Sequence, residues 1–465
     1  MGFDSIHTFY FLGIGGIGMS ALARYFAANG YQVMGYDRTE SALTKELEQE
    51  GIIVQYDDSL DKVQALDRGT TVVVRTPAVP EDAKVYVWLR EEGFKIFKRA
   101  EVLGMVTRSA QALCVAGTHG KTTTSTMLAH ILHRSHVGAN AFLGGIANNY
   151  GTNLLVDKSQ NVVVEADEFD RSFHHLTPYI SVITSMDPDH LDIYGTEDAY
   201  RASFAKYASL VQEALVVKKG ICVDLSDAVS SQCKLYTYSA SERADFFADN
   251  IRINNGELRF DFHTPDRVLC DIQLGVPAWV NIENSVAAMA VAYLVGCSDE
   301  ELRNGVESFR GVHRRFNVHV NTPHVAYVDD YAHHPQELKA SIESVKRLYA
   351  QRHVIGVFQP HLFTRTRDFI DDFAAVLSLL DEVVLLPIYP AREIPIEGVT
   401  SDWLLGKIHA HKILVEKHEL STYLHDLVKE KVAQGKDCVV VTMGAGDIDR
   451  LVKDITKTLN YEKND

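Results

Sequence analysis

The chain alternates short apolar runs of strand-forming residues with longer stretches in which apolar residues recur at helical spacing. This alternation is typical of α/β proteins, in which helices connect the strands of mainly parallel sheets. A more strand-like stretch runs from about 215 to 275, and an apolar helix is expected after Asn281. The apolar runs predict strands at 7–12, 31–36, 71–74, 112–116, 161–164, 180–185, 325–328, 353–358, 382–386 and 438–442.

The predicted elements fall into three blocks, with boundaries near Arg108 and Gly311. The length of 465 residues agrees with this division, because a domain takes roughly 150 residues. We therefore expect an α/β protein of three domains, with the boundaries 1–107, 108–311 and 312–465.

A glycine loop follows the first predicted strand. Residues 13–18, Gly-Ile-Gly-Gly-Ile-Gly, fit the pattern G-x-G-x-x-G, and Asp37 stands at the end of the next predicted strand. Such a loop lets a diphosphate approach the backbone at the positive end of a helix dipole. The pattern predicts a nucleotide diphosphate, with Asp37 binding a ribose hydroxyl. A nicotinamide cofactor would suit the same loop, and a plain tight turn is the structural alternative. The predicted binding residues are Gly15, Gly16, Ile17, Gly18 and Asp37.

A second loop follows the strand predicted at 112–116. It resembles a Walker A loop that has been shortened, because the first glycine of that motif would fall at Val115. Backbone N–H groups in such a loop hold phosphates, Lys121 reaches the β and γ oxygens, and the Thr122 hydroxyl is a ligand for Mg²⁺. A surface turn before a helix is the alternative interpretation. The predicted nucleotide-binding residues are Gly117, Thr118, His119, Gly120, Lys121, Thr122 and Thr123.

Two neighbouring strands of this block run into acids and a histidine. Glu165 follows the strand at 161–164, where a carboxylate that organises Mg²⁺ belongs beside a phosphate loop. Asp167 and Glu168 are expected to lie further from the metal or to be solvated. His190 follows the strand at 180–185 and predicts a second metal or phosphate contact, since two metal ions can neutralise charge during phosphoryl transfer.

The third block adds polar clusters beside its predicted strands. Arg315 precedes one strand and Asp330 ends it, so they can stabilise a transferring phosphoryl group and bind a nucleotide or metal. His361 and Arg365 follow the strand at 353–358, and arginine binds carboxylates through two parallel hydrogen bonds. A solvated polar face is the alternative for all of these clusters.

The amino-acid composition limits the classes of ligand and partner that these sites can bind. Lysine and arginine number 46 against 62 aspartate and glutamate, so the net charge of −16 disfavours general binding of nucleic acid or anionic membrane. No apolar run is long enough for a membrane helix, and six scattered cysteines without C-x-x-C argue against a disulfide framework and favour a reducing cytoplasm. Anionic ligands must therefore be held by local groups such as helix N-termini, a few lysine or arginine side chains, or metal ions.

Taken together, the motifs resemble the Mur ligases over nearly the whole chain. The specific matches are Gly15 to Ser20, Gly117 to Thr123, Glu165 to Glu168, Gly311 to Phe316, Asp329 to Pro335, and Gln359 to His361 with Thr364 to Arg367. The resemblance implies an N-terminal Rossmann-like domain that binds a UDP-sugar and a central P-loop domain that binds ATP and Mg²⁺. It also implies a C-terminal Rossmann-like domain that closes over the nucleotide and brings an amino acid.

The resemblance also implies individual roles. Lys121 matches the family's phosphate-binding lysine, Thr122 and Glu165 its metal ligands, and His190 its second-metal histidine. Further matches are Asn281 and Asn284 near ATP, Arg315 and Asp330 at the completed ATP site, and His361 and Arg365 near the amino acid. Val280 and Leu362 depart from the family pattern, which has histidine and commonly arginine there.

The activity implied by the resemblance is ATP-dependent joining of L-alanine to the lactyl carboxylate of UDP-N-acetylmuramate through an acyl phosphate. This would be a cytoplasmic step in the synthesis of peptidoglycan precursors. A ligase that attaches a recycled murein tripeptide to the same UDP-sugar is the nearest alternative. A nicotinamide oxidoreductase and an ATP-hydrolysing switch are alternatives from other classes. The oligomeric state stays open.

Overall fold

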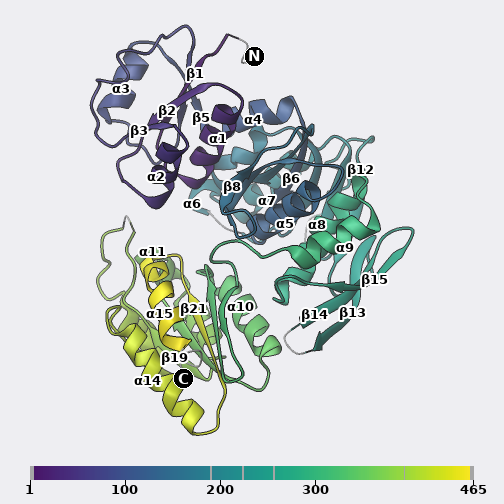
Figure 1. The fold of residues 1–465 in the computed structure, drawn as a ribbon, viewed down its shortest axis with the longest axis vertical. Helices are drawn as coiled ribbons and strands as arrows, with labels where there is room; N and C mark the ends of the chain where they lie inside the picture. Colours follow the sequence, from purple (N-terminus) through teal and green to yellow (C-terminus); the bar gives the residue numbers. More distant parts are fainter. Residues whose placement is uncertain (1–4, 189–190, 222–224, 255–256, 392, 461–465) are drawn as a thin grey trace. The chain divides into compact units, whose positions relative to one another are not determined.

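The structure is a computed structural model that describes residues 5–188, 191–221, 225–254, 257–391 and 393–460. Its strands form sheets of five, ten and six strands, and helices flank each of them (Figure 1). Contacts divide the chain into two compact units. The first consists of residues 1–249, 261–272 and 284–309, and the second of residues 250–260, 273–283 and 310–465. The predicted α/β class with three domains is confirmed, whereas the exact domain boundaries stay predictions.

The N-terminal sheet has the order β3-β2-β1-β4-β5, and its strand pairs are all parallel. Because the order reverses at β1, the loop after β1 lies at a topological switch point, where such sheets bind ligands. Its strands are β1 (Thr8–Leu12), β2 (Gln32–Tyr36), β3 (Ile53–Gln55), β4 (Thr71–Arg75) and β5 (Lys95–Lys98). Its helices are α1 (Ile17–Ala28), α2 (Ala42–Gln49), α3 (Lys84–Glu91) and α4 (Arg99–Arg108).

The ten-stranded central sheet has the order β15-β14-β13-β12-β11-β10-β6-β9-β7-β8. Strand β6 pairs in parallel with β9 and β10, and Ala116 lies level with Ala166 and Ile183, so the three strands end at one edge. Its strands are β6 (Gln111–Ala116), β7 (Asn140–Ala147), β8 (Thr152–Leu155), β9 (Asn161–Ala166), β10 (Pro178–Ile183), β11 (Ala214–Lys218), β12 (Lys234–Ser239), β13 (Phe246–Asn254), β14 (Glu257–His263) and β15 (Val268–Gln273). Its helices are α5 (Lys121–His133), η1 (Phe169–His175), α6 (Leu191–Tyr194), α7 (Glu197–Ala208), α8 (Val280–Leu294) and α9 (Asp299–Ser308).

The C-terminal sheet has the order β16-β17-β21-β18-β19-β20, in which only the β16–β17 pair is antiparallel among the described strands. Its strands are β16 (Asn317–Asn321), β17 (Val325–Asp330), β18 (His353–Phe358), β19 (Glu382–Leu385), β20 (His411–Leu414) and β21 (Cys438–Met443). Its helices are α10 (Pro335–Leu348), α11 (Phe363–Asp368), α12 (Ile370–Leu377), α13 (Ser401–Lys407), α14 (Leu420–Ala433), η2 (Asp447–Leu451) and α15 (Val452–Leu459).

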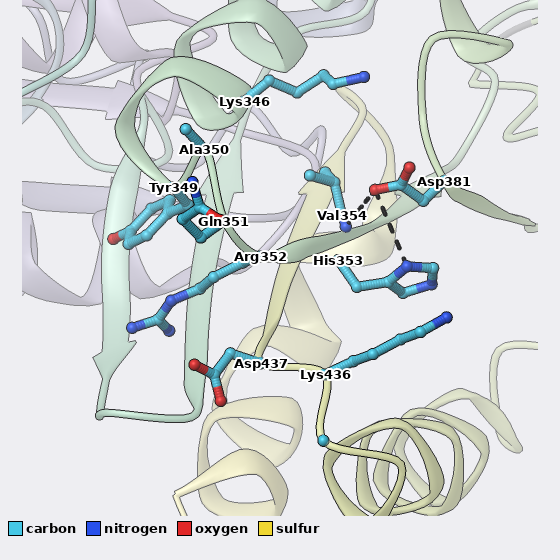
Figure 2. A pocket seen from close by; sticks show the side chains of 11 residues that line it. Lys346, Tyr349, Ala350, Gln351, Arg352, His353, Val354, Asp381, Lys436 and Asp437 are labelled. Atoms are coloured by element: carbon cyan, nitrogen blue, oxygen red, sulfur yellow. Dashed lines mark hydrogen bonds and ion pairs between the residues drawn. The ribbon is translucent and has the colours of Figure 1, made fainter.

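A pocket of about 440 Å³ lies at the edge of this sheet where β18 and β21 begin, between residues such as His353, Asp381 and Lys436 (Figure 2). Its charged groups are largely satisfied inside the protein. The Asp381 carboxylate accepts a hydrogen bond from the Val354 amide at 2.8 Å, and Lys346 Nζ donates to the Leu379 carbonyl at 2.7 Å. The candidate site residue Asp330 and Phe358, which precedes His361 and Arg365, stand at the opposite edge.

The strands predicted from apolar runs are all present, with ends shifted by one or two residues. The sequence analysis missed short edge strands such as β5 and β20, because few of their side chains are buried and their apolar signal is weak. Among the described residues, no helix is long and apolar enough to cross a membrane. The five cysteines that the structure describes carry no disulfide.

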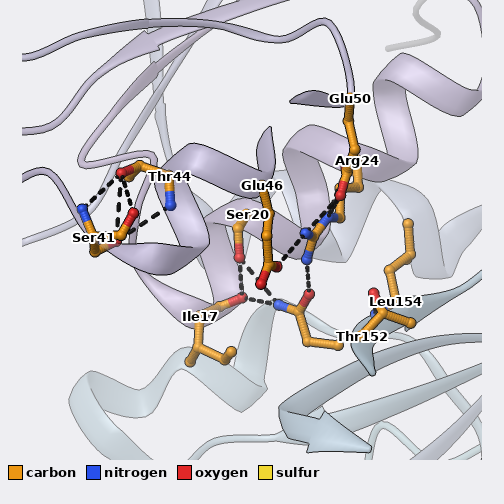
Figure 3. A network of polar contacts seen from close by, with 10 residues as sticks. Ile17, Ser20, Arg24, Ser41, Thr44, Glu46, Glu50, Thr152 and Leu154 are labelled. Carbon is orange, nitrogen blue, oxygen red and sulfur yellow. Dashed lines mark hydrogen bonds and ion pairs between the residues drawn. The ribbon is translucent and has the colours of Figure 1, made fainter. Parts of the chain in front are cut away.

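A buried polar contact joins the N-terminal sheet to the central sheet within the first unit (Figure 3). Asn153 of β8 is fully buried, and its amide nitrogen donates to the Ile17 carbonyl at 2.5 Å and to Ser20 Oγ at 3.1 Å. Its amide oxygen accepts a hydrogen bond from Arg24 at 2.7 Å. Arg24 also pairs with Glu46 and Glu50 of the α2 region. The start of α1, which carries the first glycine loop, is therefore fastened to the central sheet.

Replacing Asn153 should weaken this connection. Asn153→Ala leaves the Arg24 guanidinium and the Ile17 carbonyl without their buried partner, so we expect the free energy of unfolding to fall by about 2–3 kcal/mol. Urea unfolding followed by circular dichroism measures the change. Asn29→Ala is the matched control, because the Asn29 side chain donates only to the Tyr25 carbonyl of its own helix at an exposed position. Equal losses in the two variants would contradict a special role for Asn153.

Candidate active site

The first glycine loop connects β1 to α1 and is held by Asp37. The Asp37 carboxylate accepts hydrogen bonds from the Gly15 amide at 2.8 Å and from the Thr39 amide at 3.1 Å. A Cβ on Gly15 would lie 2.9 Å from the Asp37 carboxylate, so glycine is required for this approach. Gly16 caps α1 without a side chain, which leaves the positive end of the helix dipole open to an anion. Asp37 thus has a clear role in shaping the loop, and its contact with a ribose stays a prediction.

A cavity of about 150 Å³ lies between this loop and the end of β9, inside the first unit. Gly18, Arg99, Gly144, Glu165 and Asp167 are among the residues that line it. The Arg99 guanidinium lies over Gly18, and its nearest carboxylate oxygen, on Asp167, is 3.8 Å away. Arg99 is the only cationic side chain among the lining residues that the structure describes. The sequence analysis missed it, because Arg99 belongs to no recognisable motif.

The second loop has four residues between the end of β6 at Ala116 and the start of α5 at Lys121. Gly117 has φ of +129°, and a Cβ there would overlap the Thr184 hydroxyl, so this position requires glycine. Thr184 Oγ1 donates to the His119 carbonyl at 2.5 Å, and Ser185 Oγ accepts from the His119 amide at 2.8 Å. The residues just after β10 therefore hold the loop, a role that the sequence analysis did not assign.

The hydroxyl groups near this loop have different surroundings. Thr118 Oγ1 lies 2.8 Å from the Tyr200 hydroxyl and donates to the Asp187 carbonyl at 2.7 Å. Thr122 and Thr123, in the first turn of α5, are partly exposed. Thr122 can therefore be reached by a ligand, as the prediction of a metal-binding hydroxyl requires.

Lys121 points back into the loop instead of toward solvent. Its ammonium donates to the Gly117 carbonyl at 2.7 Å and to Glu168 Oε2 at 2.7 Å. Burial opposes the charge on Lys121, but the carboxylates of Glu168, Glu165 and Asp167 together raise its pKa above the ordinary value. The ammonium is therefore held charged beside the phosphate loop. Of the two alternatives expected for Glu168, solvation is wrong because its side chain is only 2% exposed, and a position further from the metal stays a prediction.

The candidate metal ligands that the structure describes are both oxygen donors. They are the Thr122 hydroxyl and the Glu165 carboxylate, and Mg²⁺ prefers this kind of ligand. A Cβ on Gly144 would overlap Glu165 Oε2, so the glycine leaves the space in which the carboxylate lies. The structure describes no group of three or more His, Cys, Asp or Glu side chains that could hold a metal. Mg²⁺ commonly takes one or two protein ligands and completes its shell with phosphate oxygens and water, so these residues fit it.

Of three further residues predicted in the central domain, the structure describes Asn284 and Asn281. Asn284 lies in the first turns of α8, and its Oδ1 accepts a hydrogen bond from Thr124 of α5 at 3.2 Å. The same oxygen would lie 2.9 Å from a Cβ on Gly120, which places Asn284 against the phosphate loop. Asn281 is buried and donates to the Val276 carbonyl at 3.2 Å. His190 lies outside the described residues.

In the C-terminal domain, Arg315 and Asp330 are electrostatic neighbours. Burial raises the pKa of Asp330 to about 6, and the charge of Arg315 opposes this rise. The Arg315 guanidinium lies 5.0 Å from the centre of the Tyr331 ring. The adjacent Arg314 is buried and donates to Asp329 at 3.2 Å and to the Gly444 carbonyl at 2.7 Å. Arg314 thus has a structural position, and contact of Arg315 with a ligand stays a prediction.

His361 and Arg365 also lie together, since their side-chain nitrogens are 3.4 Å apart. Burial, with the charges of His333 and Arg365, lowers the pKa of His361 to about 4, so its ring is neutral at neutral pH. Leu362 has φ of +72°, which is unusual for a residue with a side chain and marks strain at the start of α11. Both carboxylate oxygens of Glu393 hold Thr364, through its amide at 3.0 Å and through its hydroxyl. Glu393, which the sequence analysis missed, therefore orients the helix that carries Arg365.

Asp330 should make stability depend on pH in the nucleotide-free protein. The folded state keeps a proton on Asp330 up to about pH 6, whereas an unfolded aspartate loses its proton near pH 4. The contribution of Asp330 to the free energy of unfolding is therefore fully present below about pH 4 and decreases as pH rises to 6. Asp330→Asn cannot ionise, so its stability relative to the unaltered protein should rise by on the order of 2 kcal/mol between pH 4 and 7.

Urea unfolding at several pH values measures this difference. Asp368→Asn is the control, because Asp368 is half exposed and pairs with Arg367 at the surface, where an ion pair contributes little. A stability difference for Asp330→Asn that stays constant from pH 4 to 7 would mean that Asp330 ionises normally in the folded protein.

Three protein-family models match consecutive parts of the chain. The Mur ligase family catalytic domain matches residues 8–111, the Mur ligase middle domain matches 115–292, and the Mur ligase glutamate ligase domain matches 314–446. These three models together span most of the chain.

Several known proteins are similar to this chain over nearly its full length. A UDP-N-acetylmuramate–L-alanine ligase of Phocaeicola vulgatus is 54% identical over 467 residues, which cover 99% of this chain and 100% of that protein. A ligase of the same name from Flavobacterium psychrophilum is 46% identical and covers 99% of this chain and 100% of its own. The crystal structure of UDP-N-acetylmuramate-alanine ligase from Thermotoga maritima superimposes with a TM-score of 0.79 at 27% identity, covering 98% of this chain and 100% of that one. With matching domain models and full-length relatives of this identity, the chain belongs to the Mur ligase family.

Proposed function

We propose that this protein is an ATP-dependent ligase that joins L-alanine to the lactyl carboxylate of UDP-N-acetylmuramate. The observation that carries the proposal is the identity of about half of all residues to ligases of that name over essentially the full length of both chains. The arrangement of two phosphate-binding loops and a separate His-Arg pair supports it. The reaction would take place in the cytoplasm, as a step in the synthesis of peptidoglycan precursors.

The chemistry requires activation of a carboxylate. A carboxylate does not acylate an amine directly, because its leaving group would be oxide. In the proposed reaction, a lactyl carboxylate oxygen attacks the γ-phosphorus of ATP, the bond to the bridging oxygen breaks, and ADP leaves. The neutral amine of L-alanine then attacks the acyl carbon of the resulting acyl phosphate, and the tetrahedral intermediate collapses with loss of phosphate. The protein's work is mainly positioning and neutralisation of charge.

The first unit provides places for both partners of the phosphoryl transfer. The diphosphate of the nucleotide sugar would bind at Gly15 to Gly18, at the positive end of α1. The cavity of about 150 Å³ extends from Gly18 to Glu165, so a substrate that begins at the first loop can reach the edge where β9 ends. Arg99 lines this path and supplies a positive charge for the substrate's anionic groups.

The second loop would hold ATP. Lys121 would contact the β- and γ-phosphate oxygens, and the backbone of the loop from Gly117 to Gly120 would surround the phosphates. Thr122 and Glu165 would hold Mg²⁺, which neutralises phosphate charge when it is bound. Asn281, Asn284, Arg315 and Asp330 are proposed as further nucleotide contacts, and His190 as a further metal ligand.

L-Alanine would bind beside His361 and Arg365. The planar Arg365 guanidinium is suited to a carboxylate, and the neutral ring of His361 adds no second charge to repel the ammonium form of the incoming amino acid. Glu393 keeps the helix of Arg365 in place through Thr364. This arrangement supports an amino acid held by its carboxylate as the amine donor.

A phosphate-release assay tests the function. With ATP and Mg²⁺ present, we expect release to require both UDP-N-acetylmuramate and L-alanine, because the acyl phosphate forms only on the sugar and turns over only with the amine. Parallel reactions contain a murein tripeptide as donor, no donor, or a nicotinamide cofactor followed by absorbance. Faster phosphate release with the tripeptide would favour the recycling ligase. Phosphate release without either substrate would indicate a hydrolytic switch, and turnover of the nicotinamide cofactor would indicate an oxidoreductase.

Arg365→Ala tests the donor site. Loss of one charged hydrogen bond to the alanine carboxylate should raise the KM for L-alanine roughly 10- to 200-fold, whereas the KM for ATP and for the nucleotide sugar should change much less. Steady-state kinetics with each substrate varied in turn measure the three constants. Arg367→Ala is the matched control, because Arg367 is half exposed and pairs with Asp368. A similar rise in all three constants would mean that Arg365 supports the fold instead.

A further inference from the structure

Lys121, the proposed phosphate-binding lysine, forms an ion pair with Glu168 inside the protein. The ammonium and the carboxylate oxygen are 2.7 Å apart, and the two side chains are 13% and 2% exposed. An exposed ion pair is easily exchanged for water, but this pair is largely removed from solvent. Any phosphate that approaches Lys121 therefore competes with a partner that is already in place.

The ammonium has no unused hydrogen in this arrangement. A lysine has three N–H donors, and Lys121 directs them to Glu168 at 2.7 Å, to the Gly117 carbonyl at 2.7 Å and to the Thr118 carbonyl at 3.4 Å. Two of these acceptors belong to the loop that would surround the phosphates. Binding a phosphate oxygen thus requires Lys121 to release at least one internal partner.

The position of Glu168 is fixed by its own backbone. The Glu168 carbonyl accepts hydrogen bonds from the Tyr194 hydroxyl at 2.5 Å and from the Arg171 amide at 2.9 Å. Asp170 and Arg171, which follow directly, have φ of +52° and +54°, so the chain turns sharply here and directs Glu168 inward. The backbone of Glu168 is therefore held in place, which limits how far its carboxylate can follow Lys121 when the lysine moves toward a phosphate.

We infer that Glu168 is a positioning residue that holds Lys121 inside the loop before nucleotide binds and is displaced from it by the phosphates of the nucleotide. The carboxylate takes the place of a phosphate oxygen until ATP arrives and keeps the buried ammonium compensated. The affinity for ATP then depends on how much more strongly Lys121 binds a phosphate than it binds the Glu168 carboxylate. This inference rests on the proposed binding of ATP at the second loop and adds a competing internal ligand to it.

Glu168→Gln tests the inference because glutamine keeps the shape of the side chain and removes the charge. With a weaker internal partner for Lys121, the Kd for ADP should fall about tenfold, the scale of one charge-assisted hydrogen bond. Isothermal titration calorimetry with ADP measures it on the full chain, once with Mg²⁺ and once with a chelator. Tightening that occurs only with Mg²⁺ would overturn the inference, because Glu168 would then act through the metal.

A double-mutant cycle shows whether the effect passes through Lys121. In a Lys121→Met background, Glu168→Gln should change the Kd for ADP by less than about twofold, because there is no ammonium left to release. A persistent tenfold gain would mean that Glu168 repels the nucleotide directly, and it would overturn the inference. Weaker ADP binding in Glu168→Gln alone would also overturn it.

Two more variants complete the experiment. Asp167→Asn removes the same charge from the neighbouring residue, whose side chain is 39% exposed and faces Arg99, so its effect on the Kd should stay below about twofold. An equal gain would indicate a general field of the acidic cluster and would overturn the specific pair. Glu168→Asp shortens the side chain by one methylene and replaces Glu168→Gln as the test if the glutamine variant does not fold. Tighter ADP binding by Glu168→Asp supports the inference, and weaker ADP binding overturns it.

Failure of the inference and failure of the proposed function can be told apart. If the unaltered protein binds ADP but Glu168→Gln does not bind it more tightly, only the inference fails. If the unaltered protein does not bind ADP at all, the proposed function fails. The identity of the amine donor has no influence on either measurement.

Discussion

The parallel register of the strands is the constraint on which the candidate site depends. In the central sheet, the ends of β6, β9 and β10 lie level, so the phosphate loop, Glu165 and the Thr184–Ser185 support come to one edge although they are far apart in sequence. In the C-terminal sheet, Asp330 and Phe358 both lie level with Met443, which brings Arg315, Asp330, His361 and Arg365 to one edge as well. A slip of one residue would turn the strand residues Glu165 and Asp330 to the other face of their sheets.

The charge of the chain imposes a second requirement. A protein with a net charge of −16 cannot attract anionic substrates by its overall field, so each anion needs a local cation or helix dipole. The start of α1 with Arg99 is one such place, and Lys121 at the start of α5 is another. Both cations have carboxylates nearby, Asp167 beside Arg99 and Glu168 beside Lys121. Neighbouring carboxylates thus compensate the positive charges of Arg99 and Lys121.

What the sequence could predict follows from how local each feature is. The glycine loops, Lys121 and Glu165 belong to short motifs that join a strand to a helix or end a strand, so their chemistry is visible without a structure. Arg99, Asn153 and Glu168 act on partners that the fold brings to them from other elements. Arg24 and Asn153 are 129 residues apart, and Lys121 and Glu168 are 47 apart. The periodicity of the sequence does not indicate such pairs. Glu168 in particular is a charged residue of a type that is usually solvated, so its burial could not be predicted.

The burial of Glu168 follows from the requirements of the loop itself. An ammonium that points into a loop and away from water would pay a large desolvation penalty if it were alone, and a neutral lysine would bind phosphate poorly. A carboxylate at 2.7 Å offsets this penalty and keeps the lysine charged, while burial raises the pKa of Glu168 itself. The same contact necessarily weakens the attraction of Lys121 for phosphate, because one charge cannot serve both partners fully. In this chain the internal acid is Glu168, and the sharp turn at Asp170 and Arg171 follows it directly.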